Sequence, residues 1–409
     1  MKDNQKESIL VSRKYYKKNK ILSILRYNQE VSRFKIKKMT SYSMTTVIQT
    51  VDELIEDNFI VEEHCNENRV GRRPLWLKLN PEVGYFIGVD FNATSINCVC
   101  LNFLAETIVS IKTDINYTYT SEQIISKIIA TIYEIIDKIG TDNPRIFGIG
   151  IGVPGYYDSI KGIAIDYAPL PKWKNVVLKD IIQEEFKLPC YIENNVSVMA
   201  FAYKWLKYQG EPDDFIFVSI RNGSRIVPII NNQLFLNKKG YAGQLGHLKM
   251  PNSNRLCTCG KRGCLNAEIT DWAIRNKVVE AALSGQFEKT KEEMNCDINE
   301  ITIYTFLELV HERNPVAMEI LNTSAYYLGY VLGAVIDILA PKTIVLSGKL
   351  AKLGNVFIDA VREGIVDNSI SENNKKLIIK SSDFNDDIGA IGAAALVLQE
   401  EFEFINKTV

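Results

Sequence analysis

The order of apolar and polar positions in the first part of the chain is typical of a small helical unit with a hairpin. Helical spacing of apolar residues and N-cap signals predict three helices, over 17–29, 33–39 and 44–57. Ser32 and Ser43 directly precede the second and third helices and are favourable N-cap residues. Two short β-rich runs follow and predict strands over 59–63 and 75–79. Three helices and a β-hairpin are the parts of a winged helix-turn-helix.

The second and third helices of such a unit can form a helix-turn-helix pair, whose second helix enters the major groove of DNA. Hydroxyl and amide side chains at the start of that helix suit base edges, and arginines of the hairpin loop suit phosphates or a narrow minor groove. The candidate DNA-binding residues are Ser32, Arg33, Ser43, Met44, Thr45, Thr46, Gln49, Arg69, Arg72 and Arg73. The alternative is a helical oligomerisation or peptide-binding module of the same outline.

From Gly84 onward, strand-like runs alternate with helical ones. The predicted strands cover 85–91, 96–102, 147–153, 215–220, 226–230 and 343–347. The predicted helices between and after them cover 121–139, 197–205 and 325–339. This alternation is typical of an α/β fold, and the length of this part of the chain favours two lobes.

Composition places the chain among ordinary globular proteins. Of its 409 residues, 46% are hydrophobic and 24% are charged, which excludes collagen-like, disordered and disulfide-scaffold proteins. No apolar run reaches the roughly 18 residues that a membrane-spanning helix needs, and the basic N-terminus lacks the apolar core of a signal peptide. We therefore expect a cytoplasmic protein without a membrane partner.

Charge is distributed unevenly along the chain. Residues 1–80 contain 16 Lys/Arg and 10 Asp/Glu, a net charge of +6, whereas residues 81–409 contain 32 and 39, a net charge of −7. A basic N-terminal part on an acidic body favours a head that binds a polyanion. The alternative is a solvated, lysine-rich tail.

Three cysteines and one histidine give the sharpest chemical signal. Cys257, Cys259 and Cys264 lie within eight residues, and His247 precedes them. Three thiolates and one imidazole make a complete tetrahedral zinc set, and four protein ligands leave no open position for catalysis. The sequence therefore predicts a structural Zn²⁺ site, and the alternative is a coincidence of free cysteines. The other five cysteines are scattered, and we expect them to be inert small hydrophobes.

Glycine-rich motifs give nearly the whole chain a resemblance to a known family. These motifs are Gly-Ile-Gly-Ile-Gly-Val-Pro-Gly at 148–155, Gly-Gln-Leu-Gly-His at 243–247 with the cysteine cluster, Gly-Ala-Ile-Gly-Ala-Ala at 389–394, and Gly-Arg-Arg-Pro at 71–74. With them the chain resembles the ROK family of bacterial repressors, open reading frames and sugar kinases. Its N-terminal part resembles the DNA-binding head of the repressor branch.

This resemblance implies the architecture. The body is expected to have the actin-like, ribonuclease-H-like two-lobed ATPase fold, so that the α/β chain consists of a winged helix-turn-helix followed by a kinase-like body. The expected domains are a DNA-binding head over 1–80, a first lobe over 81–193 on which 380–409 packs back, and a second lobe with the zinc loop over 194–379.

Sugar kinases of the family carry carboxylates at three positions where this chain has amides. A carboxylate takes the proton from the sugar hydroxyl, and the family places it in an E-N-D segment, which reads Glu193-Asn194-Asn195 here. Two family glutamates that bind sugar hydroxyls correspond to Gln244 and Asn266. Because an amide at Asn195 cannot accept that proton, the resemblance implies no catalytic residue in this chain and no enzyme activity.

The two loops that bind ATP phosphates in the family kinases have also changed. The first, D-x-G-G-T, reads Asp90-Phe91-Asn92-Ala93-Thr94 in this chain. The second, G-T-G-x-G-G-G, reads Asn-Gly-Ser-Arg-Ile-Val-Pro at 222–228, where Val227 and Pro228 crowd a place meant for bare backbone. We therefore do not expect ATP as a cofactor.

A sugar or sugar phosphate remains the expected ligand, because amides donate and accept hydrogen bonds. The resemblance places it on Gly155, Asn194, Asn195, Gln244, His247 and Asn266. Trp173 either stacks on the sugar ring or lies in the core or an interface. The alternative is a pocket that has drifted and binds nothing.

These patterns predict a sugar-responsive transcriptional regulator, a repressor of carbohydrate-utilisation genes such as those for xylose. It is expected to bind double-stranded operator DNA as a homodimer or homotetramer. One alternative is a ROK sugar kinase with an accessory DNA-binding head. Another is a DNA-binding protein whose body responds to a protein partner. The sequence leaves open which sugar is bound and whether it releases or promotes DNA binding.

Overall fold

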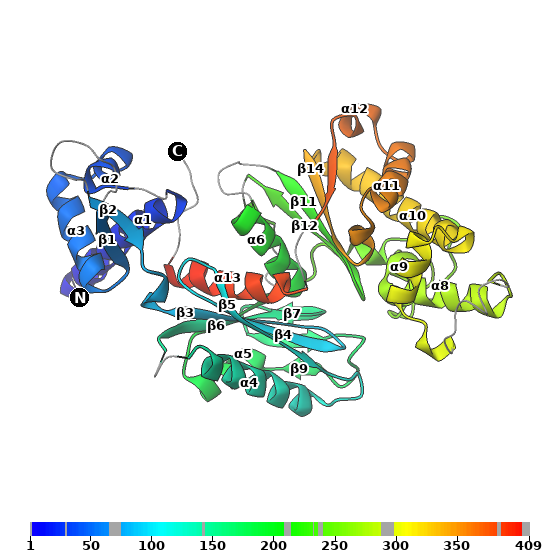
Figure 1. Ribbon diagram of the computed structural model, residues 1–409, viewed down its shortest axis with the longest axis horizontal. Helices are drawn as coiled ribbons and strands as arrows, with labels where there is room; N and C mark the ends of the chain where they lie inside the picture. The colour runs from blue at the N-terminus through cyan, green and yellow to red at the C-terminus, as the bar shows by residue number, and fades with distance from the viewer. Residues whose placement is uncertain are drawn as a thin grey trace.

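The computed structural model describes residues 2–28, 31–64, 75–140, 144–207, 214–231, 233–235, 240–287, 298–382 and 386–402 (Figure 1). They form an N-terminal head and two lobes, each lobe built around a five-stranded sheet. Among the described residues, no helix combines the length and the apolar character that crossing a membrane requires.

The head consists of three helices and a two-stranded sheet. Its elements are α1 (Lys2–Tyr27), α2 (Arg33–Met39), α3 (Met44–Glu56), β1 (Ile60–His64) and β2 (Leu75–Leu79). Ser32 and Ser43 are confirmed as N-caps, because their hydroxyls accept the amides of Lys35 at 3.3 Å and Thr46 at 3.1 Å. The first helix begins at Lys2 rather than at residue 17. Apolar spacing does not reveal this extension, because its residues are mostly polar. Many of these polar residues are straight-chain types that favour a helix without an apolar pattern.

The sheet of the first lobe has the strand order β10-β6-β3-β4-β5, with parallel pairing among its first three strands and antiparallel pairing among its last three. Its strands are β3 (Tyr85–Phe91), β4 (Ser95–Leu101), β5 (Thr107–Asp114), β6 (Ile146–Val153) and β10 (Cys190–Asn194). Helices α4 (Ser121–Lys138) and α5 (Leu178–Phe186) cover one face, and α13 (Ile388–Phe402) covers the other (Figure 1). A small sheet of β7 (Tyr156–Asp158), β8 (Ile163–Asp166) and β9 (Lys174–Val176) lies beside it.

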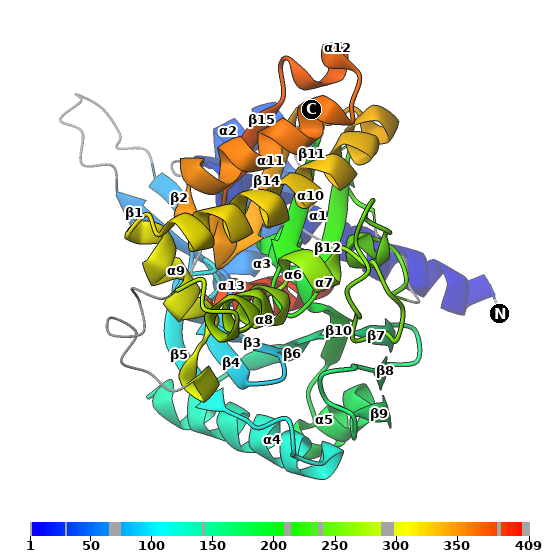
Figure 2. The same ribbon diagram turned by 90° about the vertical axis from the view of Figure 1, so that its right-hand side faces the viewer.

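The sheet of the second lobe has the strand order β13-β12-β11-β14-β15. Its strands are β11 (Phe215–Ile220), β12 (Ser224–Ile230), β13 (Gln233–Leu234), β14 (Thr343–Gly348) and β15 (Ile378–Ser381). Its α-helices are α7 (Asn266–Ile269), α8 (Asp271–Leu283), α9 (Ile303–His311), α10 (Pro315–Leu339), α11 (Asn355–Asp367) and α12 (Ser371–Asn374) (Figure 2). Short 3₁₀ helices include η2 (Leu245–His247) and η4 (Leu350–Leu353).

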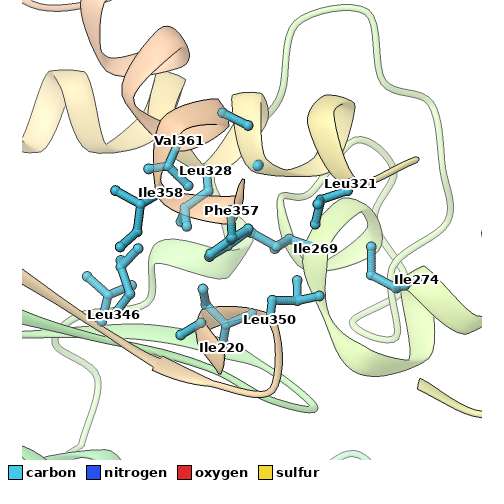
Figure 3. Close-up of a cluster of buried hydrophobic side chains, with 14 of the residues drawn as sticks. Ile220, Ile269, Ile274, Leu321, Leu328, Leu346, Leu350, Phe357, Ile358 and Val361 are labelled. Atoms are coloured by element: carbon cyan, nitrogen blue, oxygen red, sulfur yellow. The ribbon is translucent and has the colours of Figure 1, made fainter. Parts of the chain in front are cut away.

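A continuous apolar core holds the second lobe together (Figure 3). Ile220 and Leu346, at the ends of two strands, face Phe357 and Val361 from α11, and all four side chains are fully buried. Burial of one such side chain stabilises the fold by about 1.5–3 kcal/mol. The core therefore fixes the strand ends from which the loops of the second lobe emerge.

Helix α13 returns from the second lobe and lies directly on the first sheet. A Cβ at Gly88 of β3 would come within 2.0 Å of the Ala390 carbonyl oxygen, and one at Gly150 of β6 within 1.9 Å of the Ala393 carbonyl oxygen. The bare backbone at these two glycines is what permits this approach. On its other side α13 packs against α6 (Asn195–Lys207).

Candidate functional site

A cleft of about 980 Å³ lies where the strand ends of the two lobes meet. The loops after β3, β6 and β10 contribute Asn92, Gly155 and Asn195 from the first lobe. The loops after β11 and β14 contribute Arg221 and Lys349 from the second. Such a crevice at the carboxyl ends of strands is the usual position of a ligand site in α/β proteins. All six residues that the resemblance implied for a ligand line this cleft.

Asn194 and Asn195 occupy the junction of β10 and α6. Asn194 is buried, and its side-chain oxygen accepts the Val196 amide at 3.0 Å, while its NH₂ group lies 3.4 Å from the carbonyl oxygens of Val153 and Gly155. Asn194 therefore fixes the loop at Gly155 and the start of α6. Asn195 is partly exposed, and its side chain hydrogen-bonds to the buried carboxyl of Asp90.

Gln244 and Asn266 face the cleft from the second lobe. Gln244 begins η2, and its side chain makes no capping hydrogen bond there. The side-chain oxygen of Asn266 accepts the backbone amide of Ser224 at 2.8 Å and its hydroxyl at 2.9 Å. A Cβ at Gly246 would lie only 1.9 Å from that oxygen. Asn266 thus ties the segment that contains His247 to the loop after β11.

An ion pair joins the lobes at the inner end of the cleft. Arg221 lies at the end of β11, and its Nη1 is 3.4 Å from Oδ2 of Asp90, a fully buried side chain of β3. Burial raises the pKa of Asp90 to about 6, and the nearby Arg221 only partly opposes this rise. The other oxygen, Oδ1, is buried without a hydrogen bond of ordinary geometry among the described residues.

Two further contacts cross between the lobes next to this pair. Arg225 is largely buried and faces Glu193, whose carboxylate accepts the hydroxyl of Tyr157. Burial raises the pKa of Glu193 and of Tyr157, and burial lowers the pKa of Arg225. Tyr167 of the first lobe hydrogen-bonds to Asn222, and burial raises its pKa to about 12. The loop over 221–225 therefore already contacts the first lobe through its own side chains.

Lys349 fills the outer part of the second lobe's side of the cleft. Its ammonium is 2.8 Å from Oδ2 of Asp271, the first residue of α8, and 5.0 Å from the ring centroid of Tyr304. Sequence reasoning missed Arg221 and Lys349. The available signal was that each is a basic residue within two positions of the end of a predicted strand.

The four predicted metal ligands come together. Atoms of His247, Cys257, Cys259 and Cys264 that can bind a metal all lie within 4.8 Å of one another. The sulfur atoms of Cys259 and Cys264 are 3.8 Å apart, and His247 Nδ1 is 4.0 Å from the Cys257 sulfur. Thiolates on a tetrahedral zinc ion are separated by about 3.8 Å, given Zn–S bonds of about 2.3 Å. The cluster therefore has the donor set and spacing of a closed metal site.

Buried charges anchor the loop that carries these ligands. Lys277 of α8 is buried, and its ammonium is 2.7 Å from Oε2 of Glu268 and 3.0 Å from the Ser324 hydroxyl. Glu268 also accepts the hydroxyl of Ser253, within the loop. Arg255 of the same loop binds Glu280 through two hydrogen bonds of 2.9 and 2.7 Å. The loop is thus attached to α7 and α8 by side chains as well as by the cysteine cluster.

In the head, some of the predicted DNA-binding residues are exposed, and others already bond to neighbouring groups of the head. Ser43, Thr45 and Gln49 are exposed on α3, whereas Met44 and Thr46 are half-buried. Ser32 and Ser43 cap their helices. Arg33 is held by Asp52 at 2.6 Å and by Glu62, which makes it a link between α2, α3 and β1. Arg69, Arg72 and Arg73 lie outside the described residues.

The exposed side of α2 adds positive charge that the candidate set omitted. Lys35, Lys37 and Lys38 are exposed there, and the ammonium of Lys38 lies 4.7 Å from the ring centroid of Phe34. The basic stretch at 33–38 was the available signal. Trp173, in contrast, is fully buried and packs edge-on against Phe91 at 5.0 Å, so its place is in the core.

Comparison with known proteins gives matches over the body and over nearly the whole chain. The sequence model of the ROK family matches residues 86–400. The chain is 29% identical over 384 residues to the xylose repressor of Caldicellulosiruptor bescii, an alignment that covers 94% of this chain and 96% of that protein.

Two solved structures share the fold at lower identity. A ROK family transcriptional regulator, a homologue of the E. coli MLC protein, has a TM-score of 0.79 at 20% identity and covers 96% of this chain and 97% of its own. A ROK family glucokinase from Streptomyces griseus, in complex with glucose and AMPPNP, has a TM-score of 0.67 at 22% identity and covers 76% of this chain and 99% of its own. The kinase therefore shares the body, whereas the regulator also spans the head.

Proposed function

The chain belongs to the ROK family, and we propose that it is a sugar-responsive transcriptional repressor of carbohydrate-utilisation genes. The observation that carries the proposal is the end-to-end likeness to a xylose repressor, which includes the head. In this account residues 1–80 bind DNA, the cleft between the lobes over 81–193 and 194–379 binds the sugar, and 380–409 returns to the first lobe.

DNA binding is assigned to a surface of the head made by Lys35, Lys37, Lys38, Ser43, Thr45 and Gln49. All six side chains are exposed, and they lie on α2, on α3 and, for Ser43, at the N-cap of α3. Lysines contact phosphates and add affinity that depends on salt. Hydroxyl and amide groups on the second helix of the pair read base edges. As a homodimer or homotetramer, the protein would place two heads on half-sites about one helical turn apart.

DNA binding is tested by fluorescence anisotropy on DNA from upstream of the protein's own gene. Thr45→Ala and Gln49→Ala remove neighbouring groups on the exposed side of α3, and each is expected to weaken specific binding by about 1–3 kcal/mol. Lys37→Ala is expected to weaken binding to specific and unrelated DNA alike and to lower the salt dependence. Thr107→Ala, the same change on exposed β5 of the body, is the control. Equal DNA affinities for all variants would contradict the assignment of DNA binding to this surface.

The sugar would bind among the amides of Asn195, Gln244 and Asn266, with Gly155 and His247 beside them. An amide at Asn195 can hold a hydroxyl but cannot remove its proton. The chain's own side chains also fill the cleft near the former phosphate loops, through Arg221–Asp90 and Lys349–Asp271. We infer a body that binds its ligand without ATP and without phosphorylating it.

A coupled assay with ATP tests the absence of kinase activity against a panel of xylose, glucose and amino sugars. No turnover above the protein-free rate is expected for the wild-type chain. Sugar-dependent ADP formation that Asn195→Ala abolishes would establish instead the kinase with an accessory head.

We infer that the His247–Cys257–Cys259–Cys264 cluster holds a structural Zn²⁺ ion. Borderline-soft zinc is suited to a set of three thiolates and one imidazole, and four protein ligands close its coordination sphere. The ion would join the segment after β13 to the loop before α7. In this way it would keep Gln244, His247 and Asn266 in place at the cleft.

A further inference from the structure

Two helices, α6 and α13, each begin at the cleft and end near the head. Helix α6 begins at Asn195, which lines the cleft, and carries Trp205 near its other end. Helix α13 begins at Ile388, which also lines the cleft, and ends at Phe402. Figure 1 shows α13, in red, reaching from the lobes toward the head. At 1.5 Å per residue, each helix spans roughly 20 Å.

The cleft end of the pair converges on Asp90. A Cβ at Gly389, in the first turn of α13, would lie 2.3 Å from Oδ2 of Asp90. The Asn195 side chain hydrogen-bonds to the same carboxyl group, and Arg221 pairs with it from the second lobe. A change at Asn195 or Arg221 therefore acts on the starts of both helices.

Between their ends the two helices are in direct backbone contact. A Cβ at Gly392 of α13 would come within 1.9 Å of the Val198 carbonyl oxygen and 3.2 Å of the Ala202 Cβ, both on α6. At Gly88 and Gly150, α13 also lies against the backbone of β3 and β6. Close-packed elements of this kind move as units rather than deforming locally.

At the head end lie a partly buried cation, Arg26, and several aromatic rings. The Arg26 guanidinium of α1 lies 3.8 Å from the ring centroid of Trp205 and 3.4 Å from the Phe103 carbonyl oxygen. Burial lowers the pKa of Arg26 to about 10. The ring of Phe402, at the end of α13, lies 5.6 Å from that of Phe59 in the head.

We propose that α6 and α13 couple the cleft to the head as one rigid unit, and that Trp205, which Arg26 and Tyr27 of α1 contact, carries the coupling from α6 into α1. The proposal rests on the proposed function for its biological role, since an effector in the cleft must alter the head. The structural claim is narrower than this biological role. A perturbation at Asn195 reaches α1 through the ends of α6 and α13, where Trp205 contacts Arg26 and the Glu401 carbonyl accepts the hydroxyl of Tyr15. Removal of the Arg26–Trp205 contact therefore weakens the response of α1.

Arg145 provides a matched control. Its guanidinium lies 5.5 Å from the ring centroid of Phe59, in the head, and 4.8 Å from that of Phe147, in the first lobe. Arg145 therefore joins head and body by the same kind of cation–π contact. It precedes β6, however, and belongs to neither α6 nor α13.

Hydrogen exchange on the full-length protein tests the coupling without ligand or DNA. Asn195→Asp places a second carboxyl group beside buried Asp90, which perturbs the cleft end through like-charge repulsion. In the wild-type background this substitution is expected to change the exchange of amides over 17–27 in α1 by about fivefold or more. In an Arg26→Met background, α6 and α13 should respond as before, and the response of α1 should be clearly smaller. In an Arg145→Met background, the response of α1 should persist.

Trp205→Leu provides a second interruption if Arg26→Met lowers folding, as judged by circular dichroism. The proposal is overturned if Asn195→Asp never changes α1, if α1 responds in both interrupted backgrounds as strongly as in the wild-type background, or if Arg145→Met weakens the response to the same extent. Failure of the proposed function would appear separately, as absence of DNA binding or of a sugar effect in the wild-type protein. If both accounts hold, Arg26→Met retains binding of DNA and of xylose and weakens the effect of one on the other.

Discussion

Asp90 and Arg221 illustrate how single residues determine what the cleft can do. Both stand at strand ends, and their ion pair occupies the region of the altered phosphate loops. From the missing glycines the resemblance predicts that ATP binding is lost, but it could not predict the pair. The two strands are far apart in sequence, and only the folded arrangement of the two sheets brings their ends within hydrogen-bonding reach.

The raised pKa of Asp90 predicts an unusual pH dependence of stability. Its pKa rises from 3.8 in the unfolded chain to about 6 in the fold, so the folded state binds this proton more tightly. The free energy of unfolding therefore falls as pH rises from about 4 to 6, by at most about 1.4 kcal/mol per pH unit. In Asp90→Asn this contribution is absent, so the stability of the variant relative to wild type should increase over that interval.

Urea titrations at several pH values measure this difference. Asp166→Asn, which changes another acidic residue of the cleft lining, is the control. In this variant the free energy of unfolding should depend on pH as it does in the wild-type protein. A constant difference between Asp90→Asn and wild type across the interval would show that Asp90 is not held in the unusual environment described above.

At the scale of elements, the head was predictable because its signals are local. Ser32 and Ser43 cap their helices as expected, and β2 has the predicted bounds. The assignment of Arg33 to DNA illustrates the limit of such reasoning, since its partners Asp52 and Glu62 lie on other elements of the head. A charged residue at a helix start has the same sequence signature whether it contacts phosphate or a neighbouring strand.

The clustering of the one histidine and three cysteines was predictable from their spacing, but the support of their loop was not. Lys277 and Glu268 pair under the loop from different helices, and nothing in the local pattern of either segment indicates a buried charge. The loop also requires special backbone. Gly263 has φ of +74°, and a Cβ there would meet the Ser253 carbonyl oxygen at 2.7 Å. Substitution of Gly263 would therefore strain the loop next to Cys264.

Metal analysis and thermal unfolding test this loop. About one zinc ion per chain is expected, and a strong chelator or Cys264→Ser should lower Tm by about 5 °C or more, because the ion binds the folded state. Cys190→Ser alters a buried cysteine outside the cluster and should leave the zinc content unchanged. A zinc-free protein with unaltered Tm after chelation would contradict a structural ion.

At the scale of the whole molecule, the head and the first lobe share one apolar core. Ile21 and Leu54 of the head and Phe103 and Phe402 of the body belong to a single cluster of buried side chains. The sequence predicted the two parts separately and could not predict this continuity, since Phe402 comes from the far end of the chain. A shared core makes the position of the head depend on the body, which a sugar-responsive regulator requires.

The central claim is that sugar in the cleft and DNA on the head influence each other. The most direct measurement is the Kd for DNA from upstream of the protein's own gene, at fixed salt, with and without xylose and then the other sugars and sugar phosphates of a panel. We predict that one sugar changes this Kd by about tenfold or more, and that DNA changes the affinity for that sugar by the same factor, as linkage requires. Tight DNA binding that no sugar alters, together with a body that binds none of them, would contradict the account.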